Sequence, residues 1–102
     1  MQIATELAAG KATLKLNGRF DFHSHRDFRT AYESALEQAG IKEIVINFQD
    51  VDYLDSSALG MLLLLREKAE AAGKSVSLVS LQGMVKQVLE IANFGKLFSV
   101  RN

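Results

Sequence analysis

The chain begins with a strand-like alternation of apolar and polar residues. Residues 11–17 carry the period-two pattern of a half-buried strand, in which polar residues separate Ala12, Leu14 and Leu16. Residues 2–8 form a weaker strand pattern, because alanine is a poor strand former. With Ala9-Gly10 between them, the two segments predict an opening antiparallel hairpin.

A helical spacing replaces this alternation after an irregular stretch at residues 18–25. Ser24 is the expected N-cap of the helix, and Gly40 is its expected C-terminal stop. Between them the apolar residues recur every three or four positions and form one continuous face, made of Phe28, Ala31, Tyr32, Ala35, Leu36 and Ala39.

The centre of the chain joins an apolar strand to the most apolar helix. Residues 44–48 are a compact β-branched run without clear alternation, which is typical of a central strand, and residues 49–54 are predicted as the loop after it. Asp55, Ser56 and Ser57 are three consecutive residues able to cap a helix. The helix is predicted to run from there to Ala72, with Gly73 as its stop.

The remaining elements complete an alternating order. Residues 76–79 predict a strand, residues 84–93 a third amphipathic helix, and residues 99–100 a last edge strand. Strands that alternate with helices imply parallel pairing through right-handed crossovers. The predicted fold is a single α/β domain over residues 1–102: a mixed four- to five-stranded sheet with an opening antiparallel hairpin, packed against three to four helices.

Composition and charge exclude several classes of function. The 102 residues are 48% hydrophobic, enough for a real core, and twelve basic residues balance twelve acidic ones, which argues against binding nucleic acid or anionic membrane by bulk charge. The absence of cysteine excludes disulfides, thiolate zinc sites and cysteine nucleophiles. No signal peptide is visible, and the longest apolar run, residues 58–65, is too short to span a bilayer, so the cytoplasm is the expected compartment.

The junction at residues 50–60 departs most from an ordinary fold. Strand-to-helix ends are where open α/β sheets meet ligands and partners, and the hydroxyl of Ser56 is expected near the surface there. A serine or aspartate at a helix start is usually only a cap, and by pattern alone that interpretation outweighs a switch or a catalytic role. One cap needs one residue, however, so at least one of the three is free for another task.

The same helix carries a second signal on its outward face. Ala58, Leu62, Leu65, Ala69 and Ala72 lie on one side and account for packing against the sheet. Ser56, Gly60, Leu63 and Glu67 form a stripe on the solvent side, and Leu59 lies beside it. A partly apolar patch next to a hydroxyl indicates a docking surface, with Gly60 allowing close backbone approach. The alternative is that another element, such as the last helix, covers these leucines.

The segment Leu54-Asp55-Ser56-Ser57-Ala58-Leu59-Gly60 resembles the signature of STAS-domain anti-sigma factor antagonists. Their pattern is an apolar residue, Asp-Ser-Ser or Asp-Ser-Thr, a small residue and Leu-Gly. Residues 18–21 are similar to the Gly-x-apolar-Asp turn after the family's second strand, and residues 85–98 resemble its closing helix and tail. Two residues depart from the pattern: Arg19 stands where glutamate is frequent, and Ala58 where glycine is commonest.

The resemblance implies a phosphorylation switch. In such proteins the first serine after the aspartate, here Ser56, is phosphorylated; the unphosphorylated form binds an anti-sigma factor with a serine-kinase fold, and a PP2C-type phosphatase reverses the modification. Asp55 either caps the helix or orients the Ser56 hydroxyl, and Ser57 is expected to be a structural cap. No enzymatic activity, cofactor, metal, nucleic acid or membrane partner is expected, and the chain alone is expected to be monomeric. The partner surface would comprise Asp21, Asp55, Ser56, Ser57, Leu59, Gly60, Leu63 and Glu67.

Other interpretations remain alongside this one. His23 and His25 lie near Asp21 and Asp27, but no further histidine or cysteine exists to complete a nitrogen or sulfur metal site. A hydrolase would need Ser56 in a triad, yet the chain lacks a Gly-x-Ser-x-Gly elbow. The same switch acting on another signalling protein, such as a kinase/phosphatase regulator or a cyclase, and an accessory subunit of a membrane transporter are the remaining alternatives.

Overall fold

The opening hairpin is formed as predicted. In a computed structural model whose described residues are 1–101, β1 (Gln2–Ala8) pairs antiparallel with β2 (Lys11–Phe20) in a regular register, from Gln2 opposite Asn17 to Ala8 opposite Lys11. Ala9 and Gly10 connect the strands with φ values of 54° and 78°. A two-residue turn with positive φ at both positions matches the twist of the two strands that it joins. Glycine adopts the second position without strain.

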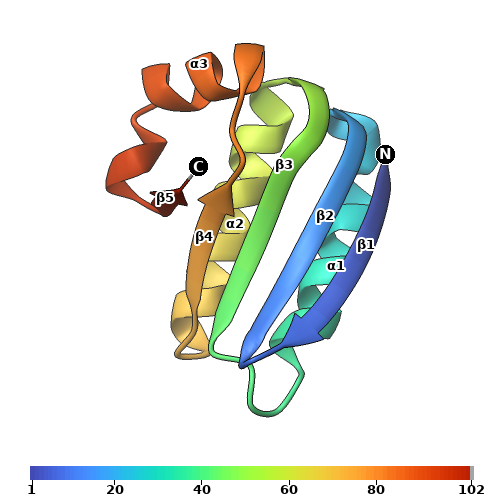
Figure 1. The fold of residues 1–102 in the computed structure, drawn as a ribbon, viewed down its shortest axis with the longest axis vertical. Coiled ribbons are helices and arrows are strands. Elements are labelled where there is room, and N and C mark those ends of the chain that lie inside the picture. Colours follow the sequence, from blue (N-terminus) through green and yellow to red (C-terminus); the bar gives the residue numbers. More distant parts are fainter. Residues whose placement is uncertain (102) are drawn as a thin grey trace.

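The other strands join this hairpin in chain order. β3 (Glu43–Leu54), β4 (Ser75–Val79) and β5 (Ser99–Arg101) each pair parallel with the preceding strand, so the sheet order is β1-β2-β3-β4-β5 (Figure 1). This confirms the predicted mixed sheet, including the short edge strand at its end. The helices α1 (His25–Leu36), α2 (Ser56–Ala71) and α3 (Gly83–Ile91) lie between the strands in sequence, with short 3₁₀ turns at Phe22–Ser24 and Phe94–Lys96.

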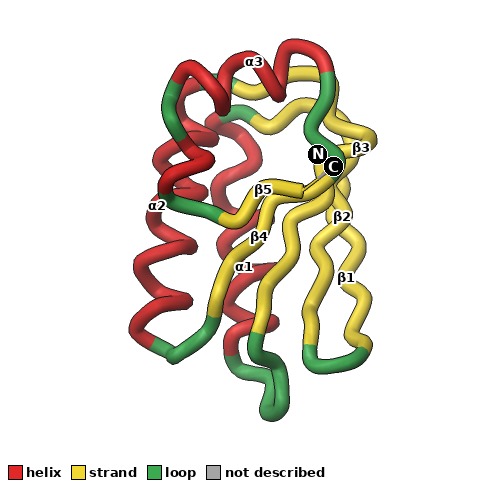
Figure 2. Tube along the Cα trace, turned by 60° about the vertical axis from the view of Figure 1, so that its left-hand side comes forward, coloured by secondary structure: helices red, strands yellow, loops and turns green. Residues whose placement is uncertain are grey.

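The core lies between the sheet and one layer of helices. α1 and α2 cover the same face of the sheet. α3 crosses the end of the sheet at which β4 ends, and it packs against β3 (Figures 1 and 2). The alternation in β2 produces this arrangement, because Leu14 and Leu16 face the helices and are fully buried while Lys15 faces outward. The largest fully buried side chains are Tyr32, Phe20, Phe28, Phe48, Leu14, Leu16, Ile44, Ile46, Leu54, Leu62, Leu65 and Leu78.

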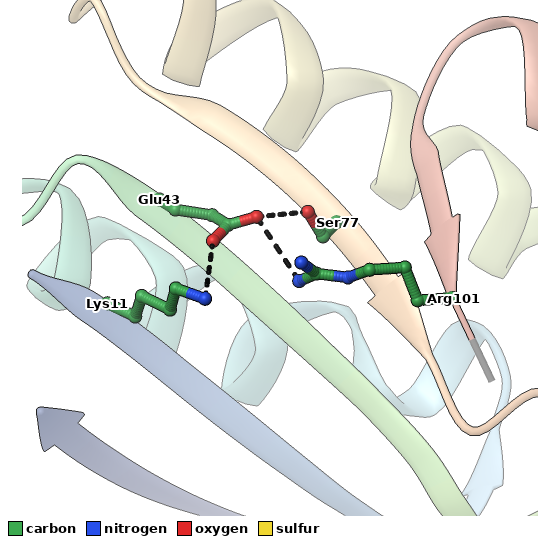
Figure 3. A network of polar contacts seen from close by, with 4 residues as sticks. All are labelled: Lys11, Glu43, Ser77 and Arg101. Atoms are coloured by element: carbon green, nitrogen blue, oxygen red, sulfur yellow. Dashed lines mark hydrogen bonds and ion pairs between the residues drawn. The ribbon is translucent and has the colours of Figure 1, made fainter. Parts of the chain in front are cut away.

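The opposite face of the sheet carries a polar network across four strands (Figure 3). Glu43 on β3 accepts a hydrogen bond from the buried Ser77 hydroxyl on β4. Its carboxylate also lies 3.5 Å from the Lys11 ammonium on β2 and 3.4 Å from the Arg101 guanidinium on β5. The Ser77 hydrogen bond is the largest cause that lowers the pKa of Glu43. Together with Arg101 and Lys11 it outweighs burial, which raises this pKa.

Two strands extend further than the sequence pattern predicts. The prediction ended β2 at Asn17 and made residues 49–54 a loop, but β2 reaches Phe20 and β3 reaches Leu54. Register shifts between Lys15 and Asn17 and between Gly18 and Arg19 let the pairing continue, and the φ of +108° at Gly18 suits such an irregularity. Burial of Val51 and Leu54 favours the longer strand over a loop.

The first helix is shorter than predicted. α1 ends at Leu36, so Ala39 lies beyond the helix and is exposed, and Gly40 is not its immediate stop. The Lys74 ammonium donates to the carbonyl oxygens of Leu36 at 2.8 Å and Gln38 at 3.1 Å. A cation at the last carbonyls satisfies groups that a longer helix would otherwise have bonded, and the chain turns there toward the buried Ile41.

Candidate functional site

The start of α2 is held against the end of β2. Phe20, near the end of β2, pairs with Leu54 on β3, and the backbone N–H of Asp55 donates to the carbonyl oxygen of Phe20 at 3.2 Å. The two strands are parallel, so the segments that follow them leave the same end of the sheet. Asp21 and Asp55 therefore emerge side by side, as the resemblance to the STAS pattern implied.

Asp55 is the residue that caps α2. Its backbone is extended, and its side-chain oxygen Oδ1 accepts a hydrogen bond from the N–H of Ala58 at 3.1 Å. Ser56 is the first helical residue and is exposed, whereas Ser57 is the second and is partly buried. The expectation that Ser57 is a structural cap is therefore wrong, because the aspartate two positions earlier has that role.

Arg19, near the end of β2, is held by contacts with Asp21 and Tyr53. Asp21 accepts a hydrogen bond from the N–H of His23 at 3.0 Å through Oδ1, and its Oδ2 lies 3.8 Å from Nε of Arg19. The guanidinium carbon of Arg19 also lies 4.0 Å from the centre of the Tyr53 ring, a cation–π contact. The positive charge that departs from the family pattern thus faces Asp21 and Tyr53 beside the start of α2.

The predicted stripe along α2 is exposed at every position. Ser56, Gly60, Leu63 and Glu67 all face solvent, and 41% of Leu63 is accessible, so α3 does not cover it. A side chain built at Gly60 would meet nothing within 4 Å, which leaves the backbone open to approach. Leu59 differs, because it is partly buried and packs against the core. On the opposite side of the helix Ala58, Leu62, Leu65 and Ala69 are buried as predicted, while Ala72 is exposed.

The apolar surface extends beyond the predicted stripe. Leu64 is 42% exposed and Phe22, in the turn before α1, is 60% exposed. A groove of about 90 Å³ between α1 and α2 is lined by His25, Phe28, Arg29, Tyr32, Met61 and Leu64. The signal for Met61 and Leu64 was present in the sequence, because the five apolar residues at 61–65 cannot all face the sheet from one helix.

The histidine and acidic side chains of the described residues do not form a metal site. Nδ1 of His25 lies 2.9 Å from the carbonyl oxygen of Phe22, and the His25 ring stacks on the Phe22 ring with centroids 5.0 Å apart. Within residues 1–101, no group of three or more histidine, aspartate and glutamate side chains is arranged to hold a metal ion. No helix in the same range is long and apolar enough to cross a bilayer.

Comparison with known proteins identifies what this arrangement resembles. A family model described as "Mlab, STAS domain" matches residues 3–99. A STAS-domain containing protein of Pseudomonas aeruginosa is 43% identical over 88 residues, which cover 86% of this chain and 85% of that protein. An anti-sigma F factor antagonist of Paenibacillus polymyxa is 22% identical over 100 residues, covering 98% of this chain and 86% of that protein.

The fold of a solved antagonist matches closely in two states. The anti-sigma factor antagonist SpoIIAA in its unphosphorylated form matches with a TM-score of 0.76 and 22% identity, over 99% of this chain and 88% of that one. SpoIIAA of Bacillus in its phosphorylated form matches with a TM-score of 0.74 and 20% identity, over 99% and 92%.

Proposed function

Because the chain belongs to the STAS-domain family, we propose that it is a cytoplasmic protein-binding switch controlled by phosphorylation of Ser56. The unphosphorylated form binds an anti-sigma factor with a serine-kinase fold and so frees a sigma factor. Phosphorylation of Ser56 releases that partner, and a PP2C-type phosphatase restores binding. The chain itself performs no catalysis in this scheme, since Ser56 is the substrate of its partner.

The observation that supports this proposal is that Asp55 caps α2 while the Ser56 side chain is left exposed. Asp55 alone supplies the capping bond of α2. The Ser56 hydroxyl is exposed at the first helical position and begins the stripe that continues through Gly60 and Leu63. A kinase can therefore reach Ser56 without breaking a cap, and a partner lying along the stripe would contact the same hydroxyl.

The position of Ser56 also explains how a phosphate could act without unfolding the domain. A phosphoserine carries about −1.5 to −2 charges at neutral pH. At a helix N-terminus that charge meets free N–H groups and the positive end of the helix dipole, which favour it. That SpoIIAA retains a similar fold in both forms, matching with TM-scores of 0.76 and 0.74, supports the expectation.

The phosphate would act instead on the partner interface. Asp21, which pairs with Arg19, and Asp55 already lie at this end of the stripe, so the phosphate adds to a region where two carboxylates face one cation. Burying it against a partner would remove water from a dianion, which costs free energy unless the partner supplies a matching cation. The apolar part of the stripe around Leu63 cannot compensate for that desolvation.

The proposal is tested by capturing partners from a lysate of the source cells with immobilised wild-type, Ser56→Ala and Ser56→Asp protein. We expect a kinase-fold protein to bind the wild type and Ser56→Ala but not Ser56→Asp. Ser34→Asp, which adds the same charge at an exposed serine of α1, is the matched control and should bind like the wild type. Intact-mass measurement after incubation with the captured kinase should show one phosphate on the wild type and none on Ser56→Ala.

Folding of the variants decides how the result is interpreted. Circular dichroism of Ser56→Asp should match the wild type, since the charge lies at a favourable helix end. Loss of structure in Ser56→Asp, or its retention of the partner, would overturn the mechanism. A cyclase or another kinase/phosphatase regulator captured with the same dependence on Ser56 would keep the switch and change its output. Capture of a transporter ATPase by every variant would favour the accessory-subunit alternative.

A further inference from the structure

The two edges of the sheet differ in how they are protected from other strands. β5 is an edge of only three residues and ends at Arg101, and short, charged edge strands resist pairing with another chain. β1 is a seven-residue edge with a regular register and no bulge against β2. It contains no lysine or proline, and Glu6 is its one charged side chain. Figure 1 shows β1 as the outermost element on its side of the sheet.

The hairpin register defines which backbone groups of β1 point outward. In a two-residue hairpin the residues that flank the turn, here Ala8 and Lys11, exchange both of their backbone hydrogen bonds. Because hydrogen-bonded and non-hydrogen-bonded pairs alternate, every second residue back along β1 directs its N–H and C=O away from β2. Those residues are Ile3, Thr5 and Leu7. Within residues 1–101 no strand pairs with that edge.

We propose that the outer edge of β1 is an interface for a second copy of this chain, in which the two β1 strands pair antiparallel about a two-fold axis at Thr5. In this register Thr5 lies opposite Thr5 of the second copy, and Ile3 lies opposite Leu7. All three outward-facing residues then fall in hydrogen-bonded pairs, giving up to about six inter-strand hydrogen bonds. The edge is thus complementary to itself, which a two-fold interface requires.

The side chains fit the same register. Ile3 is partly buried against the core, whereas 52% of Leu7 is exposed beside the buried Ala12. Pairing would place the exposed Leu7 against Ile3 of the second copy on the helix-covered side of the sheet, where cross-strand aliphatic pairs are favourable. On the other side Glu6 would face Ala4, so the one charged residue of the strand does not meet its own copy.

Charge and size set the expected strength. The chain has no net charge at neutral pH, so two copies do not repel each other over long range. A seven-residue strand is about 24 Å long, and pairing along it buries less than the roughly 1,200 Å² of a standard stable interface. The dimer should therefore be weak, with a dissociation constant on the order of 100 µM, so the chain would still be monomeric at low concentration, as the sequence led us to expect.

The paired edges close the assembly at two copies. After pairing, the remaining edges of the combined sheet are the two short β5 strands, which should not recruit a third copy. α2 lies behind β3 and β4, away from the β1 edge of the sheet (Figure 1). The dimer would thus present two separate stripes for partner binding, and the inference does not depend on the proposed function of Ser56.

Sedimentation velocity of the purified chain, from about 5 µM to about 500 µM, tests this interface. We expect a reversible shift from monomer to dimer with no larger species. Thr5→Lys places two ammonium groups opposite each other and should weaken association about tenfold or more. Thr30→Lys makes the same change at an exposed threonine of α1 and should leave association unchanged. Circular dichroism should show both variants folded, since each threonine is exposed.

Cysteine cross-linking tests the register, because the chain has no cysteine of its own. Under mild oxidation Thr5→Cys should form a disulfide-linked dimer, since hydrogen-bonded residues across an antiparallel pair have Cα atoms about 5.5 Å apart. Leu7→Cys is the matched control on the same strand, and its two copies would lie too far apart to bond. A wild type that stays monomeric at every concentration would overturn the proposal, as would equal cross-linking of both variants or association unaffected by Thr5→Lys.

Discussion

Replacing the Asp55 side chain would test whether one hydrogen bond fixes the start of α2. Asp55→Ala removes the oxygen that accepts from the N–H of Ala58 at 3.1 Å. It leaves the backbone N–H of residue 55, which donates to Phe20, in place. The change therefore separates the cap from the tie between α2 and the end of β2.

The expected loss in the free energy of unfolding follows from the capping geometry. Replacing a capping aspartate by alanine costs about 1 kcal/mol, within a range of roughly 0.5–2 kcal/mol. For a domain of this length that corresponds to a fall in Tm of about 4–8 °C. Asp55→Asn keeps an acceptor oxygen and loses only the attraction of a negative charge to the helix dipole, so it should cost a few tenths of a kcal/mol.

Guanidinium chloride and thermal unfolding at neutral pH measure both variants. Asp27→Ala is the control, because Asp27 is an exposed acidic residue in the first turn of α1 and reports the loss of charge near a helix start. The reasoning is refuted if Asp55→Asn destabilises as much as Asp55→Ala, or if Asp55→Ala has no effect. A folded Asp55→Asn protein that is no longer phosphorylated would assign the aspartate a second role at Ser56.

Two further predictions concern the core and the open face of the sheet. Leu62→Ala should lower the free energy of unfolding by about 2–5 kcal/mol, because Leu62 is fully buried. Leu63→Ala, on the exposed stripe, should lower it by less than about 1 kcal/mol. Denaturant titration measures both losses, and equal losses would contradict the burial pattern. Because the Ser77 hydrogen bond and Arg101 lower the pKa of Glu43, its stabilisation is present above its ordinary value of 4.5 and is lost as the pH falls through the lower folded value. Glu43→Gln should therefore show a weaker loss of stability than the wild type when unfolding is measured from pH 5 down through that range, and an unchanged pH profile would contradict it.

The elements that the sequence predicts well are those whose pattern has one physical cause. The alternation in β2 and the spacing in α2 each reflect burial of one face, so the hairpin, the helix and the exposed stripe from Ser56 to Glu67 follow from them. The exposed hydroxyl of Ser56 follows as well, because three possible caps compete for one position. Which residue caps was not predictable, since aspartate and serine are almost equally good N-caps.

The elements that the sequence predicts poorly depend on distant partners. Residues 49–54 contain two aspartates and look like a loop, yet pairing with β2 through two register shifts makes them strand. α1 stops at Leu36, where Lys74, 38 residues later, donates to the carbonyl oxygen of Leu36 and to that of Gln38 beyond the helix. Leu59 turns toward the core because of how α2 rotates against the sheet. Local periodicity contains none of this information.

The agreement between chain order and sheet order has a consequence for folding. Every strand pairs with the strand made just before it, so no strand waits for a partner later in the sequence. Each parallel addition closes a loop of one helix and its turns, so no strand pairing has to span more than one such loop. During synthesis the sheet can therefore grow from β1 towards β5 as the chain leaves the ribosome.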